Sequence, residues 1–264
     1  MKIALIAGNG LLPVEIAKKL FENEGSKPLI LAIRDDPEIL RPYADKLISF
    51  KAPLISRSLR EIKSWGADTL IMAGGISKKV LYLLPLLFDK LSRQVIKNSL
   101  RDDHSLLGAV VEIFEREGLK VIPYWQILPE FLASAGKLSL RKPNEQEFKD
   151  IECGKNILKI TLPCSFGQGV IIADGAVVAV EAMEGTDMMI KRAGSLIHHG
   201  VLIKMMREDQ DLRYDLPTVG PVTLNGMHEA GLTCLAVESG RTLILEPEKF
   251  FNLADKYKIA VFGI

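Results

Sequence analysis

Short apolar runs alternate with segments of helical spacing along the first half of the chain. The apolar runs have the length of buried strands and cover residues 2–7, 28–33, 47–50, 69–73 and 119–123. Helical patterns lie between them, notably at residues 12–20, 55–65 and 103–118. Strands that alternate with helices are typical of parallel βαβ units. This half is therefore predicted to form an α/β domain around a parallel sheet.

The second half has a different pattern. Residues 133–149 are polar and contain Gly136, Pro143 and Asn144, a change that marks a domain boundary. We place the boundary near Leu138, which gives domains 1–137 and 138–264. Strands are predicted over 157–162, 169–182, 201–205, 232–237, 242–245 and 259–262, with a hairpin turn at Asp174-Gly175 and helices over 186–197 and 221–230. This order favours an α/β domain with a mixed sheet.

Composition and charge narrow the class of protein. The 264 residues include 34 Lys and Arg against 33 Asp and Glu, a balance that argues against a nucleic-acid-binding surface but allows a local anion site. The three cysteines are widely spaced, as expected in a reducing compartment. The longest apolar stretch, 80–88, has about half of the roughly 18–20 residues that a membrane span needs, so we expect a soluble, cytoplasmic protein.

Two glycine loops follow predicted strands. Gly8-Asn9-Gly10 lacks the third glycine of a dinucleotide fingerprint, and Asp35 and Asp36 come late for the acidic position, so a tight turn is favoured over a dinucleotide site. Residues 74–79, Gly-Gly-Ile-Ser-Lys-Lys, combine backbone donors with ammonium groups and suit a phosphate, although a solvated loop explains them equally well. Loops at adjacent strand ends would face one crevice.

Other polar segments also precede helices. Thr186 and Asp187 are candidates for a helix cap or for an anion site at the helix N-terminus. Residues 102–105, Asp-Asp-His-Ser, suit a metal or proton transfer, but a helix cap is the simpler interpretation. Cys164 and Ser165 would need a partner base to act as nucleophiles, and spacing alone shows none.

The most informative stretch covers residues 204–221. A buried-type strand ends in carboxylates and cations and then enters a Pro/Thr/Gly loop. Asp211 and Asp215 are suited to hold Mg²⁺ or to position water, whereas residues 208–211 also fit a charged surface loop. His198, His199 and His228 form no H-x-x-x-H pair and favour capping or exposed roles.

Six segments occur in one order along nearly the whole chain: IAGNGLLP, GGISKK, DDHSLLGAVVEIFE, SFGQGV, EAMEGTDMMI and KMMREDQDLRYDLPTVGPVT. Together they resemble the LpxI family, the UDP-2,3-diacylglucosamine pyrophosphatases of lipid A biosynthesis. The resemblance implies a Rossmann-like N-terminal domain, a C-terminal α/β domain and a substrate held between them. It also implies hydrolysis to 2,3-diacylglucosamine 1-phosphate (lipid X) and UMP, a homodimer, and possible peripheral contact with the inner membrane.

The resemblance also implies residue roles. The essential aspartate aligns with Asp215, with Asp211 as the alternative register, and both are expected ligands of Mg²⁺ or a similar divalent cation. Contacts to sugar or phosphate are expected from Gly10, Leu12, Gly75, Ile76, Lys78, Gln168, Thr186, Asp187, Lys204 and Thr218. Pyrophosphate cleavage requires such cations and donors, and the acyl chains require an apolar groove, for which the Leu- and Met-rich segments 80–91 and 188–197 are candidates.

Two other function classes remain open at this stage. A carrier would bind the diacyl sugar nucleotide without turnover, and a nucleotide-dependent oxidoreductase would need a cofactor for which the glycine fingerprint is weak. Acyl-chain length and the phosphorus that is attacked are also open.

Overall fold

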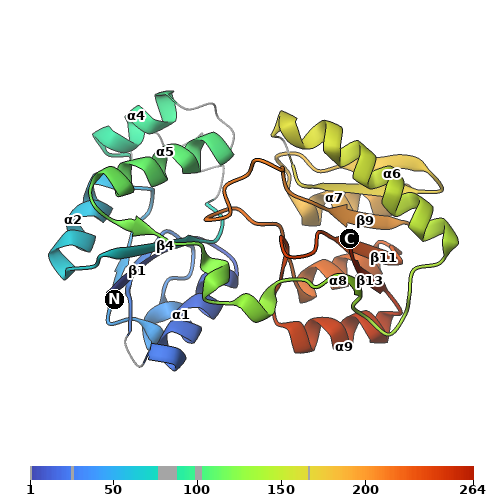
Figure 1. Cartoon of the computed structure of the whole chain (residues 1–264), viewed down its shortest axis with the longest axis horizontal. Helices are drawn as coiled ribbons and strands as arrows, with labels where there is room; N and C mark the ends of the chain where they lie inside the picture. Colours follow the sequence, from blue (N-terminus) through green and yellow to red (C-terminus); the bar gives the residue numbers. More distant parts are fainter. Residues whose placement is uncertain (1, 25–26, 77–87, 99–102, 166) are drawn as a thin grey trace. The chain divides into compact units, whose positions relative to one another are not determined.

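The computed structural model describes residues 2–24, 27–76, 88–98, 103–165 and 167–264. The chain divides into two compact units. In Figure 1 the first 129 residues are coloured from blue to green and the later ones from green to red. Unit 1 is Met1–Pro129 with Asp211–Asp215, and unit 2 is Glu130–Gln210 with Leu216–Ile264. The division falls shortly before the boundary after residue 137 that composition predicts, and each unit is described separately below.

Unit 1 contains the parallel sheet that the strand pattern predicts. In the order β3-β2-β1-β4-β5, its strands are β3 (Lys46–Ser49), β2 (Leu29–Ala32), β1 (Ile3–Ala7), β4 (Thr69–Ala73) and β5 (Lys120–Val121). All neighbouring pairs are parallel. The carboxyl ends of β1 and β4 are therefore adjacent at one edge of the sheet.

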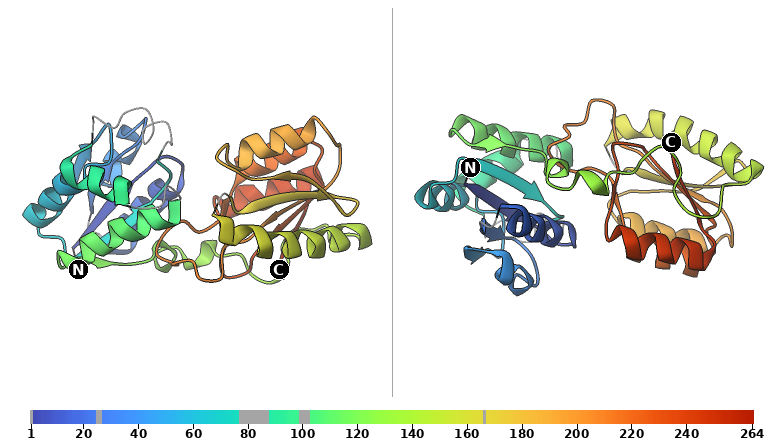
Figure 2. Two further views of the ribbon diagram at one scale, coloured as in Figure 1. Left: turned by 90° about the horizontal axis from the view of Figure 1, so that it is seen from above. Right: turned by 60° about the horizontal axis from the view of Figure 1, so that its bottom comes forward.

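Helices cover both faces of this sheet. On one face lie α2 (Ile55–Trp65), α4 (Lys90–Asn98) and α5 (Asp103–Arg116), and their buried side chains form one cluster with alternate residues of β1, β2 and β4. The other face carries α1 (Leu12–Glu24), as Figures 1 and 2 show. Short 3₁₀ helices at Glu38–Tyr43 and Tyr124–Gln126 complete the connections.

Unit 2 contains the predicted mixed sheet. In the order β6-β13-β11-β9-β7-β8, its strands are β6 (Gly136–Lys137), β13 (Ala260–Gly263), β11 (Cys234–Val237), β9 (Val201–Lys204), β7 (Gly169–Ala173) and β8 (Ala176–Val180). The pairs β9/β11 and β11/β13 are parallel and the other pairs are antiparallel. Asp174 and Gly175, with φ of 50° and 79°, form the predicted hairpin turn between β7 and β8. A separate parallel pair joins β10 (Thr218–Val219) to β12 (Leu243–Ile244).

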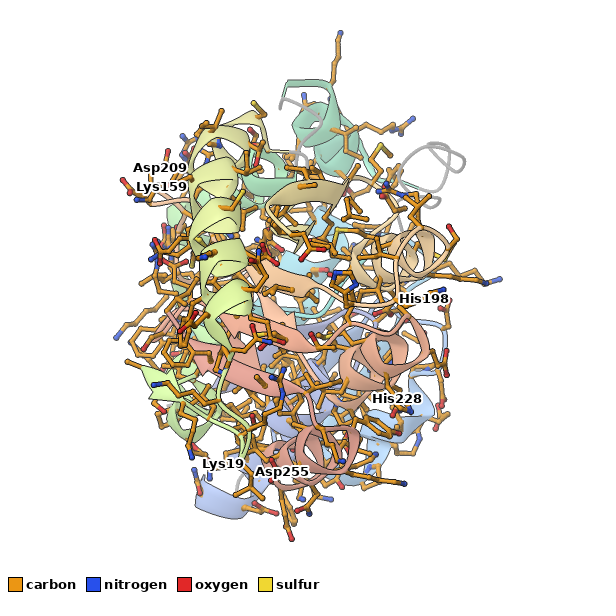
Figure 3. All side chains as sticks on the ribbon, turned by 90° about the vertical axis from the view of Figure 1, so that its right-hand side faces the viewer. Lys19, Lys159, His198, Asp209, His228 and Asp255 are labelled. Atoms are coloured by element: carbon orange, nitrogen blue, oxygen red, sulfur yellow. The ribbon has the colours of Figure 1, made fainter. Side chains whose placement is uncertain are left out.

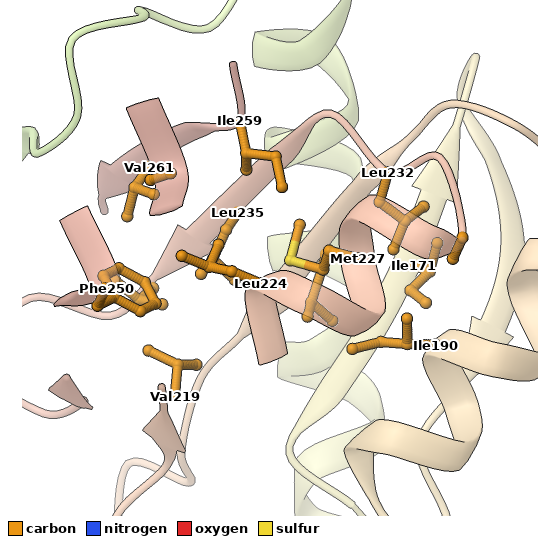
Figure 4. Close-up of a cluster of buried hydrophobic side chains, with 14 of the residues drawn as sticks. Ile171, Ile190, Val219, Leu224, Met227, Leu232, Leu235, Phe250, Ile259 and Val261 are labelled. Carbon is orange, nitrogen blue, oxygen red and sulfur yellow. The ribbon is translucent and has the colours of Figure 1, made fainter. Parts of the chain in front are cut away.

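Alternating side chains of the unit 2 strands build two cores. On one face α6 (Glu145–Thr161) packs through Ile151 and Leu158. On the other face lie α7 (Thr186–Gly194), α8 (Pro221–Glu229) and α9 (Pro247–Tyr257), whose apolar side chains meet Ile171 and Leu235 in Figure 4. The sheet is thus a buried layer between helices, which fixes the positions of its strand ends.

Two predicted elements need correction, and one observed helix was not predicted. Residues 157–162 are not a strand but the last turns of α6 and the start of a 3₁₀ turn, because a capping box between Asn144 and Glu147 starts a helix that continues to Thr161. The helix predicted over 186–197 ends at Gly194, and α9 had no prediction. The helical segment predicted over 80–91 falls largely outside the described residues. Within the described part of the chain, no helix is long and apolar enough to cross a membrane.

Candidate active site

Two glycine loops meet at the carboxyl edge of the unit 1 sheet. The Asn9 N–H donates to the Gly75 carbonyl at 2.7 Å, and the Gly75 N–H donates to the Asn9 carbonyl at 3.1 Å. Gly74 has a φ of +83°, and a Cβ there would lie 2.6 Å from the Asn9 oxygen, so only glycine fits. We call Gly8–Gly10 together with Gly74–Gly75 the glycine edge. It brings together Gly10 and Gly75, as the adjacency of the strand ends predicts.

Arg34, a cation that was not predicted from the sequence, supports the glycine edge. Arg34 follows β2, and its Nη1 donates to the carbonyl oxygens of Gly8 at 3.4 Å and Gly10 at 3.2 Å. The backbone N–H of Asp35 donates to Asn9 Oδ1 at 3.0 Å. The buried Arg34 Nε has no hydrogen-bond partner among the described atoms. The one available signal was the position of Arg34 directly after a strand of the parallel sheet.

Asp215 belongs to a segment that packs with unit 1. The segment is anchored by Tyr214, which is 4% exposed within the α2/α4/α5 core, and by Arg213, which forms an ion pair with Glu115 on α5. Burial, followed by the negative charge of Asp211, raises the pKa of Tyr214 to about 12. A Cβ on Gly108 would lie 3.1 Å from the Tyr214 hydroxyl, so a small residue on α5 accommodates this ring.

The two candidate aspartates have different surroundings. Both Asp211 carboxylate oxygens accept hydrogen bonds from the Arg213 guanidinium, the closest at 2.6 Å, and Oδ1 also accepts the Arg213 N–H at 2.9 Å. Asp215 is exposed and has a φ of 57°, a left-handed conformation that few residues other than glycine, asparagine and aspartate adopt readily. Asp215 thus lies at a constrained turn of the backbone, and Asp211 is the ion-pair partner of Arg213.

An apolar cavity of about 190 Å³ lies beside Asp215 in unit 1. Side chains from α2, α4 and α5, most of them apolar, line one part of it, apolar residues of the sheet and its loops line another, and Gly74, Gly75 and Asp215 also line it. These three residues are exposed, so they lie at the open side of the cavity. The predicted contact residue Ile76 is half-buried in the same lining. A carboxylate, part of the glycine edge and an apolar pocket thus occur together.

A buried lysine lies at the carboxyl end of β9 in unit 2. The Lys204 Nζ donates to Thr186 Oγ1 at 2.7 Å and lies 3.9 Å from Glu181 Oε2. The Thr186 hydroxyl donates to Glu181 Oε1 at 2.7 Å, and the backbone N–H of Gln168 donates to Glu181 Oε2 at 3.3 Å. We call Glu181, Thr186 and Lys204 the lysine cluster. It brings together Gln168, Thr186 and Lys204 from the predicted set and adds Glu181.

Neighbouring structure leaves space for this cluster. Gly169 pairs with Lys204 across β7 and β9, and a Cβ on Gly169 would lie 2.8 Å from Glu181 Oε2. Helix α7 begins after Gly185 with no side-chain cap on its first turn, so Thr186 does not cap it and its hydroxyl is used by the cluster. Asp187 is exposed in that first turn. The backbone donors of this helix end are therefore next to a fixed ammonium group.

The remaining predicted residues belong to neither the glycine edge nor the lysine cluster. Leu12 is buried at the start of α1, and the Thr218 hydroxyl donates to the Leu216 carbonyl at 3.1 Å. Lys78 and residues 99–102 lie outside the described part of the chain. His198 and His228 are exposed, as Figure 3 shows, and His199 Nε2 lies 2.8 Å from Asp174 Oδ2. Among the described residues, no group of three or more His, Cys, Asp or Glu is placed to hold a metal ion.

Comparison with known proteins decides the family. The LpxI N-terminal domain model matches residues 2–131 and the LpxI C-terminal domain model matches residues 134–262. The chain belongs to the LpxI family. Over 277 aligned residues it is 30% identical to the UDP-2,3-diacylglucosamine pyrophosphatase LpxI of Caulobacter vibrioides, with 100% of this chain and 97% of that protein covered. The family resemblance predicted from the six ordered segments is confirmed.

Proposed function

We propose that this protein hydrolyses the pyrophosphate bond of UDP-2,3-diacylglucosamine, giving UMP and 2,3-diacylglucosamine 1-phosphate in lipid A biosynthesis. The observation that carries the proposal is the lining of the unit 1 cavity, which joins the Asp215 carboxylate and the glycine edge to apolar walls. A substrate that fits this lining has an anionic part and an apolar part. Membership of the LpxI family supports the same substrate.

Asp215 has the role of orienting the attacking water in this proposal. Its oxygen atoms accept a hydrogen bond from water, which turns a lone pair of the water towards a phosphorus. The new P–O bond forms as the bridging P–O bond of the anhydride breaks, and the water proton passes to the carboxylate or to solvent. Attack at either phosphorus breaks the same anhydride and gives the same two products.

The negative charge of the phosphates requires donors and cations. The backbone N–H of Gly10 in the glycine edge and those of the first turn of α7, at Thr186 and Asp187, are proposed as donors, and Gly75, whose N–H is bonded to Asn9, is proposed as a neighbouring contact. Lys204 supplies an ammonium group, paired with Glu181, behind that turn. The remaining proposed contacts are Leu12, Ile76, Lys78, Gln168 and Thr218, and the expectation that the substrate lies between the two domains stays a prediction.

Exposure and position favour one of the two candidate aspartates as the ligand of a divalent cation. The Asp211 oxygens are engaged by Arg213, whereas Asp215 is exposed and lies by the cavity. Mg²⁺ characteristically retains waters and binds through one or two carboxylates together with substrate phosphates. We therefore propose Asp215 as its protein ligand, with Asp211 holding Arg213 in place. When bound, Mg²⁺ would neutralise charge on the phosphate oxygens.

Location and assembly follow the family resemblance. A substrate that carries two acyl chains resides in a membrane, so we propose that the protein works in the cytoplasm with peripheral contact at the inner membrane. We also propose a homodimer. Sedimentation of the protein alone tests the homodimer, and its sedimentation with lipid vesicles tests the peripheral membrane contact.

Mass spectrometry of the reaction products tests the proposed function. The wild-type protein is incubated with UDP-2,3-diacylglucosamine and Mg²⁺ in H₂¹⁸O, and we expect UMP and the sugar phosphate, with one ¹⁸O in one of them. The labelled product identifies the phosphorus that is attacked. Recovery of intact bound substrate would indicate a carrier instead, and turnover that requires a nicotinamide cofactor would indicate an oxidoreductase.

A further inference from the structure

We infer that the apolar cavity of unit 1 binds one acyl chain of the substrate and limits the length of that chain. The inference rests on the proposed function, since it concerns the substrate of the same site. It goes further because it assigns a chain-length limit to particular side chains of this protein.

The chemistry of the lining favours a hydrocarbon occupant. Asp215 is the one charged side chain among the described lining residues, and it lies at the open side. The buried Ser92 hydroxyl is already used, because it accepts the Ile55 N–H at 3.0 Å and donates to Asp89 Oδ1 at 2.8 Å. An apolar chain in the cavity therefore leaves the Ser92 hydroxyl with its partners and directs the polar head of the substrate to Asp215.

The size of the cavity fits one chain rather than two. A dry apolar cavity of about 150 Å³ in another protein holds benzene, a ring of six carbons. The cavity here, at about 190 Å³, therefore accommodates a single chain segment of similar carbon number. The second acyl chain of a diacyl sugar requires another location.

Helix α5 sets the extent of the cavity. Leu106, Leu107, Val110 and Phe114 recur at three- and four-residue intervals and line the cavity from one face of this helix. The first three are half-buried, whereas Phe114 is 1% exposed and packed in the core. Because exposure decreases along this face, we infer that Phe114 lies at the inner end of the cavity and Val110 nearer its open side.

A series of substrates with different acyl lengths tests the inference. We would measure kcat/KM of wild type, Val110→Phe and Phe114→Leu for UDP-diacylglucosamines with short, intermediate and long chains. The ratio of long-chain to short-chain kcat/KM is the readout, because partial loss of folded enzyme cancels in it. Val222→Phe, at a 62%-exposed position on α8, is the matched control.

Opposite shifts of this ratio are expected from the two cavity variants. Each methylene buried in an apolar site contributes about fourfold. Val110→Phe should therefore lower the ratio at least tenfold, Phe114→Leu should move the preferred length to longer chains, and Val222→Phe should match wild type. Equal loss for all chain lengths in both cavity variants would overturn the inference while leaving the proposed function intact.

Titration of the sugar phosphate product separates the inference from the proposed function. Calorimetric titration of wild type and Val110→Phe with 2,3-diacylglucosamine 1-phosphates of the same chain lengths requires no turnover. We expect long-chain affinity to fall selectively in Val110→Phe. If wild type hydrolyses none of the substrates but shows this selectivity, the proposed function fails and the chain-length inference stands. Affinity that does not depend on chain length in wild type would overturn the inference.

Discussion

Lys204 and Glu181 are both buried in unit 2, and one hydroxyl, that of Thr186, hydrogen-bonds to both of them. The ammonium and the carboxylate lie 3.9 Å apart, close enough to neutralise each other in a region with little water. The Glu181 carboxylate therefore offsets part of the cost of burying the Lys204 ammonium.

Glu181→Gln should destabilise unit 2 because it leaves the Lys204 charge buried without its carboxylate. We expect a loss of about 3 kcal/mol in the free energy of unfolding, measured by urea denaturation. Lys204→Met should cost a similar amount by the reverse argument. The double variant should recover much of both losses, and strictly additive losses would show that the two charges are not coupled.

Gly74→Ala should destabilise unit 1 through the close approach of the two glycine loops. A left-handed alanine alone costs about 1 kcal/mol. Gly118 has a similar φ of +88° but open space around it, so Gly118→Ala measures this backbone term by itself. Gly74→Ala should cost at least twice as much in calorimetric unfolding, because its Cβ would meet the Asn9 carbonyl. Equal losses would contradict the proposed packing.

The free energy of unfolding of unit 2 should fall in acid, because the stabilisation contributed by the Glu147 carboxylate is lost when it is protonated. Burial alone would raise its pKa, but hydrogen bonds from Arg141, the Thr233 hydroxyl and the Asn144 N–H outweigh burial and lower it. A lowered native pKa means that the unfolded state binds more protons, so this stabilisation is complete above about pH 4.3 and is lost as the pH falls through the native pKa.

Urea denaturation at several pH values tests this sign. The difference in unfolding free energy between wild type and Glu147→Gln should be constant near neutral pH and shrink below about pH 4.3. Glu145→Gln, an exposed position on the same helical turn, is the control. A difference that grows in acid would contradict the assignment.

Removal of divalent cations should abolish hydrolysis, and added Mg²⁺ should restore it. If Asp215 is the protein ligand, the Mg²⁺ concentration for half-maximal activity should rise at least tenfold in Asp215→Glu, which keeps the charge but moves it. In Asp211→Asn the same concentration should change less than threefold, because Asp211 is engaged with Arg213. The opposite order of effects would assign the metal to Asp211.

The strand ends of unit 1 were predictable from sequence because the signals are local. Each buried strand is an uninterrupted apolar run, and parallel strands necessarily bring their carboxyl ends to one edge, so Gly10 and Gly75 were expected together. In unit 2 a local signal gave a wrong prediction. The run from Ile157 to Leu162 has the composition of a strand, and a strand was predicted there. The capping box at Asn144 and Glu147 and the helical spacing of Ile151 and Leu158 determine a helix there.

Glu181 was not predictable because it depends on register across three strands. Gly169 pairs with Lys204 on one side, and its carbonyl accepts the Glu181 N–H on the other at 2.9 Å. One sequence does not show which residues of β7, β8 and β9 are neighbours. Similarly, the role of Arg34 follows only from the structure, in which its guanidinium donates hydrogen bonds to carbonyl groups of the glycine edge.

The rate of UMP release by Asp215→Asn, compared with Asp211→Asn and wild type, tests the central claim most directly. All three proteins are assayed with saturating UDP-2,3-diacylglucosamine and Mg²⁺, and their folding is checked by urea denaturation. We predict that kcat falls at least a hundredfold in Asp215→Asn, as expected for loss of a group that positions the attacking water, and less than tenfold in Asp211→Asn. Wild-type kcat in a folded Asp215→Asn protein would contradict the account.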